Sequence, residues 1–124
     1  MSARIAHICV DAVDAAALAA FWSQVLDQPV DEGASPYYAG IGIADRQPGR
    51  TAMMFLMVPE PPSGTKNRVH VDLVADGDLA AETARVVALG ATHVGDFDEY
   101  GTTWASFTDP EGNAFDIAVA GAHQ

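Results

Sequence analysis

Two histidines occupy equivalent positions in two similar stretches of the chain. His7 lies in the middle of Arg4–Val10 (RIAHICV), and His70 lies in the middle of Asn67–Leu73 (NRVHVDL). Imidazole is both a common metal ligand and an acid–base group near neutral pH. A histidine repeated at the same phase of two similar segments therefore predicts a duplicated unit with a pseudo-symmetric site where its halves meet.

Strand alternation predicts which face these side chains occupy. Successive side chains point to opposite faces of a strand, so His70 and Asp72 share one face while the neighbouring aliphatic residues share the other. In the stretch that follows residue 113, Asp116 alternates with Phe115 in the same way. If the apolar faces pack against helices, we expect His7, His70 and Asp116 to project into one concave space.

Two imidazoles and one carboxylate are a donor set that holds divalent metal ions. Such a facial triad binds non-haem Fe(II), Mn(II) or a related ion and leaves positions open for a substrate. The alternative is that His7, His70 and Asp116 are cavity residues held by hydrogen bonds without a metal. Asp72 is a candidate substitute ligand or a hydrogen-bond partner for a histidine.

A second set of residues is expected to line a pocket for a small molecule. Such pockets combine apolar and aromatic walls with a few polar groups. We expect contacts to the ligand from Tyr38, Phe55, Asp72 and Trp104. For Phe55 the alternative is a place in the hydrophobic core. The acidic run 95–101 is interpreted as either an exposed loop over the cavity or an ordinary hairpin connection.

Hydrophobic periodicity predicts the elements that carry these residues. Apolar runs predict strands at residues 5–10, 37–43, 51–58, 69–74, 92–94, 102–108 and 114–119. Two helices are expected after the N-cap residues Asp14 and Asp78, with Gly90 as the C-terminal cap of the second. The expected order is strand, helix and three strands, twice, although these ranges supply only two of the three later strands in the first half; residues 109–113 are expected to form a turn.

Composition limits the class of protein. The 124 residues include 49% hydrophobic and 19% charged residues, which is typical of one globular domain whose halves share a core. A formal net charge of -11 disfavours nucleic acid, and no apolar run is long enough for a membrane span. The first residues lack a signal-peptide pattern, so we expect a cytoplasmic protein. Cys9 is expected to be buried, and His93 and His123 to be solvated.

Three motifs together resemble a known superfamily. Asn67–Leu73, then Ala88–Ala91 (ALGA), then Asp109–Asn113 (DPEGN) before an apolar strand look like the vicinal oxygen chelate superfamily, in particular its small glyoxalase-like members. The resemblance covers essentially the whole chain. It implies an α+β fold of two βαβββ modules, about residues 1–60 and 67–120, whose curved mixed sheets surround a central cavity. The Pro/Gly/Ser-rich stretch around residues 59–66 would be the linker within this single domain.

The same resemblance implies a ligand set. Metal-binding members of the superfamily take ligands from the first and last strands of each module, which match His7, His70 and Asp116. Two positions depart from the pattern: Leu56 stands where glyoxalase I-like enzymes have their other carboxylate, and Asp116 is one methylene shorter than the usual glutamate. The implied cofactor is Fe, Mn, Ni or Zn, or none.

Two hypotheses for the function remain. The first is a metal-dependent enzyme of the lyase, isomerase or extradiol-type dioxygenase kind, acting on a small organic molecule. The second is a metal-free protein that binds and sequesters a small molecule, as drug-resistance proteins of the bleomycin-resistance type do. Small two-module members are commonly homodimers, so a homodimer is expected in either case.

Overall fold

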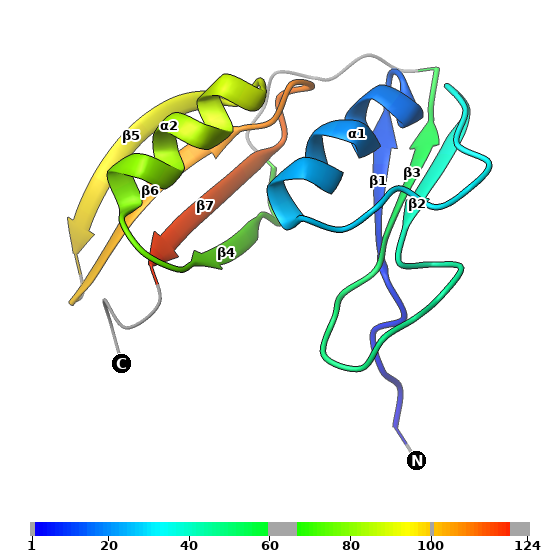
Figure 1. Cartoon of the computed structure of the whole chain (residues 1–124), viewed down its shortest axis with the longest axis horizontal. Coiled ribbons are helices and arrows are strands. Elements are labelled where there is room, and N and C mark those ends of the chain that lie inside the picture. The colour runs from blue at the N-terminus through cyan, green and yellow to red at the C-terminus, as the bar shows by residue number, and fades with distance from the viewer. Residues whose placement is uncertain (1, 60–66, 100, 120–124) are drawn as a thin grey trace. The chain divides into compact units, whose positions relative to one another are not determined.

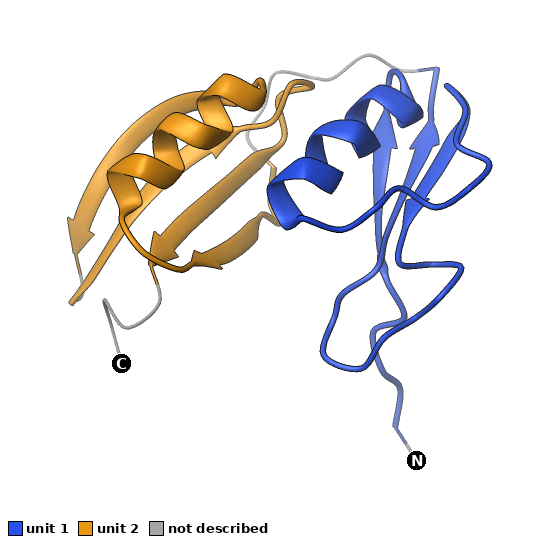
Figure 2. Cartoon of the chain, viewed as in Figure 1, with its two compact units in different colours: residues 1–61 blue, residues 62–124 orange. Residues whose placement is uncertain are grey.

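The computed structural model describes residues 2–59, 67–99 and 101–119, and the chain divides into two compact units, residues 1–61 and 62–124 (Figure 2). Unit 1 contains β1 (Ile8–Ala12), α1 (Ala15–Leu26), β2 (Tyr38–Ile41) and β3 (Met53–Met57) (Figure 1). Unit 2 contains β4 (Val71–Ala75), α2 (Leu79–Leu89), β5 (Thr92–Glu99), β6 (Thr102–Thr108) and β7 (Ala114–Val119). Within the described residues, no helix is both long and apolar enough to cross a bilayer.

Unit 1 packs one helix on a three-stranded sheet of order β1-β3-β2. β1 runs parallel to β3, and β2 runs antiparallel to it. α1 buries the apolar stripe predicted from its spacing, including Leu18, Phe21 and Trp22, while Ile41 and Phe55 in the strands are completely buried. This burial of alternate strand residues beneath α1 forms the core of unit 1.

Unit 2 repeats this arrangement with one more full strand. Its sheet has the order β4-β7-β6-β5, with β4 parallel to β7 and the other pairs antiparallel. The two sheets correspond strand by strand if β5 matches the segment around Val30, which forms an isolated bridge to Ile41 beside β2. The duplicated pattern expected from the sequence is thus complete in unit 2, whereas one strand of unit 1 is reduced to a single bridge.

The helix ends follow the expected capping chemistry. Asp14 Oδ1 accepts a hydrogen bond from the Ala17 amide at 3.1 Å, and the Asp78 carboxylate accepts from the amides of residues 80 and 81. Gly90 ends α2 at φ 125, a conformation that glycine adopts without a Cβ clash. The capping predictions for Asp14, Asp78 and Gly90 are therefore confirmed.

The first strand of each unit begins later than predicted. Strands were expected at residues 5–10 and 69–74, but Ile5 and Val69 are 84% and 85% exposed, and β1 and β4 begin at residues 8 and 71. β1 and β4 pair with their neighbouring strands only from Ile8 and Val71 onward, so apolar character alone did not fix where the strands begin. His7 and His70 consequently lie just before their strands. The prediction that Cys9 is buried is also wrong, because its side chain is exposed.

The acidic run after residue 94 is a strand rather than a covering loop. β5 continues to Glu99 and pairs with β6 in a hairpin, so the hairpin interpretation is correct as far as the described residues extend. A register shift between His93 and Gly95 marks a β-bulge. Residues 60–66 of the predicted linker, about 59–66, and the predicted solvated His123 lie outside the described residues.

Candidate metal centre

One face of the unit 2 sheet carries a row of polar side chains. Strand pairing places Asp72 beside Asp116 and Asp116 beside Ser106, on β4, β7 and β6 respectively. The neighbouring residues Phe115 and Phe107 are buried in the core of unit 2. Because side chains alternate along a strand, Asp116 and Ser106 project from the opposite face of the sheet.

His70 lies against this row from the position just before β4. Its Nε2 atom is 3.1 Å from Asp72 Oδ1 and 3.3 Å from Asp116 Oδ2. The side chain of Asp116 is 25% exposed, compared with 36% for His70 and 76% for Asp72. One potential ligand atom from each of the three residues lies within 4.8 Å of the other two. Asp72 thus contacts His70, as the hydrogen-bond partner considered from the sequence would, and its role as a ligand stays a prediction.

These distances fit the donor spacing of a divalent ion. Ligands about 2.1 Å from an octahedral ion and at right angles to each other are about 3 Å apart. Both separations from His70 Nε2 are close to this value. An imidazole and two carboxylates are also the donor types that Fe(II) and Mn(II) accept. The same spacing suits a direct hydrogen bond between the imidazole and the carboxylates, so this geometry fits a metal but does not require one.

Ser106 is a functional candidate that the sequence analysis missed. Its Oγ atom donates a hydrogen bond of 2.6 Å to Asp116 Oδ1, while Oδ2 of the same carboxylate faces His70. The sequence could have indicated that Ser106 is a neighbour of Asp116. The five-residue turn 109–113 aligns residue 108 with residue 114, and this alignment places Ser106 opposite Asp116.

The structure brings together two of the three predicted metal ligands. His70 and Asp116 are in contact in unit 2, whereas His7 belongs to unit 1. There His7 Nδ1 lies 3.2 Å from Arg46 Nη2, and the same guanidinium donates to the Ala6 carbonyl. A guanidinium only donates, so Nδ1 accepts and the neutral ring carries its proton on Nε2. This contact would have to break before His7 Nε2 bound a metal, and the participation of His7 stays a prediction.

Comparison with protein families gives a match over nearly the whole chain. Residues 7–118 match the family model described as "Glyoxalase-like domain". The chain belongs to the glyoxalase-like family. This confirms the resemblance inferred from the three motifs. A comparison of the sequence with curated proteins gave no significant match.

Solved structures share the fold of this glyoxalase-like chain. A glyoxalase/bleomycin resistance protein/dioxygenase family enzyme from Burkholderia phytofirmans PsJN has a TM-score of 0.75 at 20% identity, covering 94% of this chain and 98% of that one. The E126Q mutant of the fosfomycin resistance protein FosX from Listeria monocytogenes, solved with Mn(II) and 1S,2S-dihydroxypropylphosphonic acid, has a TM-score of 0.73 at 15% identity, covering 100% and 93%. Lactoylglutathione lyase from Agrobacterium tumefaciens has a TM-score of 0.65 at 17% identity, covering 96% and 95%. These similarities confirm the α+β fold with two mixed sheets.

The predicted pocket residues of the glyoxalase-like chain lie in different environments. Trp104 is half-buried and projects from the same face of β6 as Ser106, two residues away, and its ring stacks on Phe97 with centroids 5.3 Å apart. Tyr38 is 37% exposed on β2. Phe55 is fully buried, so it contributes to the core of unit 1 rather than to a solvent-accessible wall.

His93 forms a second imidazole–carboxylate pair in unit 2. Its Nε2 atom is 2.9 Å from Asp96 Oδ1, and its ring lies 5.3 Å from the buried ring of Phe107. The expectation that His93 is solvated is confirmed, because the residue is exposed, although it also pairs with Asp96. A contact with Phe107 places His93 on the opposite sheet face from Asp116, and only one carboxylate accompanies it in the part of the chain that the structure describes.

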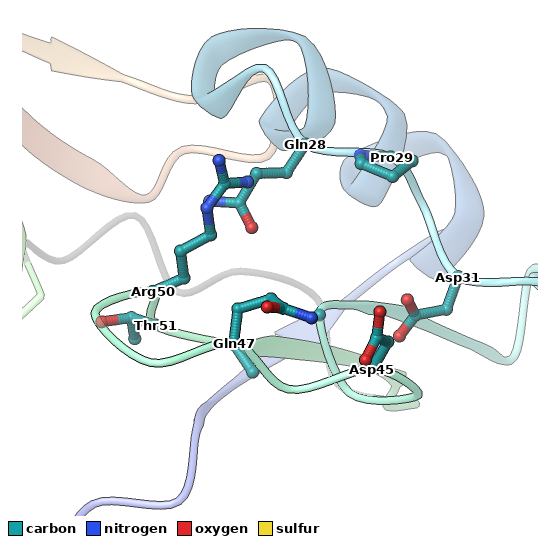
Figure 3. Close-up of a pocket in the computed structure, with 9 residues that line it drawn as sticks. Gln28, Pro29, Asp31, Asp45, Gln47, Arg50 and Thr51 are labelled. Carbon is teal, nitrogen blue, oxygen red and sulfur yellow. The ribbon is translucent and has the colours of Figure 1, made fainter.

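Unit 1 of the glyoxalase-like chain contains a small pocket of about 220 Å³. Figure 3 shows Asp31 and Asp45 at one end and Arg50 at the other. The pocket is lined by Gln28, Pro29, Asp31, Gly42, Asp45, Gln47, Arg50, Thr51 and Ala52. Asp31 Oδ2 already accepts hydrogen bonds from the amides of Ile43 and Ala44. We therefore assign Asp31 a structural role at the end of β2, and none of the predicted ligand-binding residues lines this pocket.

Proposed function

We propose that this glyoxalase-like protein binds a divalent cation, one of Fe, Mn, Ni or Zn, through His70 and Asp116. His7 is the proposed third ligand, with Asp72 as its alternative or as a hydrogen-bond partner of His70. The observation that carries the proposal is the position of His70 Nε2, within 3.3 Å of a carboxylate oxygen on each of two neighbouring strands. The Mn(II) ion in the structurally similar FosX supports it, because that protein shares the fold.

The proposed substrate is a small organic molecule. A divalent ion held here would act as a Lewis acid toward oxygen atoms of the substrate. His70 and Asp116 would hold the ion, and Trp104 and Tyr38 would contact the rest of the molecule. Leu56 replaces a carboxylate of glyoxalase I-like enzymes, which favours a three-ligand site of the extradiol-dioxygenase type over the glyoxalase I reaction. We therefore rank an extradiol-type dioxygenase activity first. A lyase or isomerase activity other than the glyoxalase I reaction comes second.

A second candidate function is binding of a small molecule without a metal. The observation in its favour is that His70 Nε2 already lies within hydrogen-bonding distance of both carboxylates, a contact that needs no added cation. The formal charge of -11 would favour a cationic ligand. In that case the protein would sequester the molecule rather than transform it.

Metal content distinguishes the two functions. We expect protein purified without a histidine tag and equilibrated with Mn(II) to bind the ion stoichiometrically, and His70→Ala to lose at least about 100-fold in affinity, because the central donor is removed. His93→Ala is the matched control, since it removes an imidazole paired with a carboxylate on the opposite face of the same sheet. Affinity for Mn(II), measured by calorimetry, checks the prediction.

Two outcomes would contradict the metal proposal. Wild-type protein that binds no divalent ion, or His70→Ala and His93→Ala that bind equally well, would favour the metal-free function.

We further propose that the protein is cytoplasmic and forms a homodimer, in keeping with the superfamily resemblance. Its mass in solution, measured by sedimentation, tests the dimer.

A further inference from the structure

The two oxygen atoms of Asp116 have different partners. Oδ1 accepts the 2.6 Å hydrogen bond from Ser106 Oγ, and Oδ2 lies 3.3 Å from His70 Nε2. The first contact crosses from β7 to β6, and the second reaches toward the edge strand β4. The Asp116 carboxylate is therefore held by Ser106 through one oxygen, while its other oxygen faces His70.

This hydrogen bond restrains the χ2 torsion, which sets the orientation of the Asp116 carboxylate. The χ2 torsion of an aspartate is broad, so an unrestrained Asp116 would sample several orientations. A hydroxyl-to-carboxylate bond at 2.6 Å has the length of a strong, charge-assisted hydrogen bond. Ser106 is itself fixed by its place in β6, between the buried residues Ala105 and Phe107.

We infer that Ser106 is a positioning residue that directs Asp116 Oδ2 toward the ligand position shared with His70. This inference rests on the proposed metal site and deepens it. Asp72 has no comparable restraint among the contacts that the structure shows, since its carboxylate contacts His70 and is 76% exposed. Asp116 is thus the ordered carboxylate ligand, and its order comes from Ser106.

The test compares Mn(II) affinities of hydroxyl-deletion variants. Residues that orient a metal ligand by hydrogen bonding typically change metal affinity 10- to 100-fold when removed. We expect Ser106→Ala to bind Mn(II) about ten-fold more weakly than wild type, and Ser106→Thr, which keeps the hydroxyl, to restore affinity to within about three-fold. Electron paramagnetic resonance of free Mn(II) measures these affinities without any enzymatic assay.

A matched control is available on the same strand. Thr103 Oγ1 donates to Asp98 Oδ1 at 3.2 Å, so Thr103→Val also deletes a hydroxyl that bonds to an aspartate between β5 and β6. We expect this variant to bind Mn(II) as wild type does. Unfolding temperatures of all variants separate loss of affinity from loss of fold.

The outcomes separate the two proposals. If wild type binds Mn(II), His70→Ala does not, and Ser106→Ala retains wild-type affinity, the role of Ser106 is overturned while the metal site stands. Equal losses in Ser106→Ala and Thr103→Val would likewise assign Ser106 a structural role only. Failure of the wild type to bind Mn(II) would overturn the metal site and the inference together.

Discussion

Asp72 and Asp116 share one imidazole partner. Asp72 and Asp116 are direct partners across the parallel strands β4 and β7, and like charges in that position destabilise a sheet. The structure places His70 within hydrogen-bonding distance of both. A bound cation would offset the repulsion between them. This convergence of two carboxylates on one imidazole is why these three residues form a candidate functional site.

The Glu82–Arg85 pair gives a pH dependence at the residue scale. The hydrogen bond from Arg85 lowers the pKa of Glu82 below its ordinary value of 4.5, and the two oxygens of Glu82 are each 2.8 Å from a guanidinium nitrogen. A lowered folded-state pKa stabilises the fold above pH 4.5, and this contribution is lost as the pH falls through the folded-state pKa.

Glu82→Gln should therefore reduce the free energy of unfolding at pH 7 and change it little once Glu82 is protonated in both states. We expect about 0.3–0.5 kcal/mol, because the pair is partly exposed and three residues apart on a helix. Urea unfolding of both proteins from pH 7 down to pH 3 measures the difference. A difference that stays constant over that range would show that the ion pair is not its origin.

At the scale of elements, the two helices end in different ways. α2 ends at a glycine, whereas α1 ends at Asp27 with φ 52 and ψ 48, the left-handed region that disfavours a side chain. The carboxylate of Asp27 also lies at the negative end of the helix dipole. α1 thus carries two small unfavourable contributions at its C-terminus.

Replacing Asp27 by glycine should stabilise the protein. We expect Asp27→Gly to raise the free energy of unfolding by about 0.5–1 kcal/mol, since it relieves the backbone strain and removes the misplaced charge. Gly90→Ala, at φ 125, is the opposite control and should lower it by about 1 kcal/mol. Chemical denaturation measures both. A lower free energy of unfolding for Asp27→Gly would show that the Asp27 carboxylate makes a contact whose stabilisation exceeds the backbone strain and the charge effect.

The turn between β6 and β7 positions the candidate site from a distance. Asp109 is 3% exposed, and its Oδ1 atom accepts hydrogen bonds from the amides of Glu111 and Asn113, each at 2.9 Å. Asn113 Nδ2 donates to the same carboxylate. These contacts hold a turn that aligns β6 with β7. The pairing of Ser106 with Asp116 follows from that alignment.

At the scale of the whole molecule, each unit has a sheet and one helix but few residues. Units of about 60 residues bury little apolar surface and are only marginally stable alone. We therefore propose that the chain is a single domain whose units fold together. This proposal predicts one cooperative transition in calorimetry.

Conservative core variants test that cooperativity. Phe55→Leu in unit 1 and Phe115→Leu in unit 2 alter fully buried side chains, and each should cost about 1–2 kcal/mol. If the chain is one cooperative domain, both variants shift the same single transition. Two transitions, each moved by only one of the variants, would instead show that the units unfold independently.

Much of the fold follows from local patterns in the sequence. Apolar spacing predicted both helices, Asp14 and Asp78 predicted where they begin, and β6 and β7 have the predicted limits, residues 102–108 and 114–119. The three motifs around His70, Gly90 and the 109–113 turn led to the correct family. These features were predictable because capping, periodicity and turns depend on residues near one another in the chain.

The candidate site depended on packing and register. The sequence by itself determined that His70, Asp72 and Asp116 have suitable chemistry and share sheet faces, but only the tertiary structure decided that both carboxylates meet His70 and that Ser106 holds Asp116. It also decided that β4 begins after His70, because pairing with β7 starts at Val71, opposite Phe115. The physical reason is that alternation gives the face of a residue, whereas pairing between distant strands and burial beneath a helix decide which side chains on that face are neighbours.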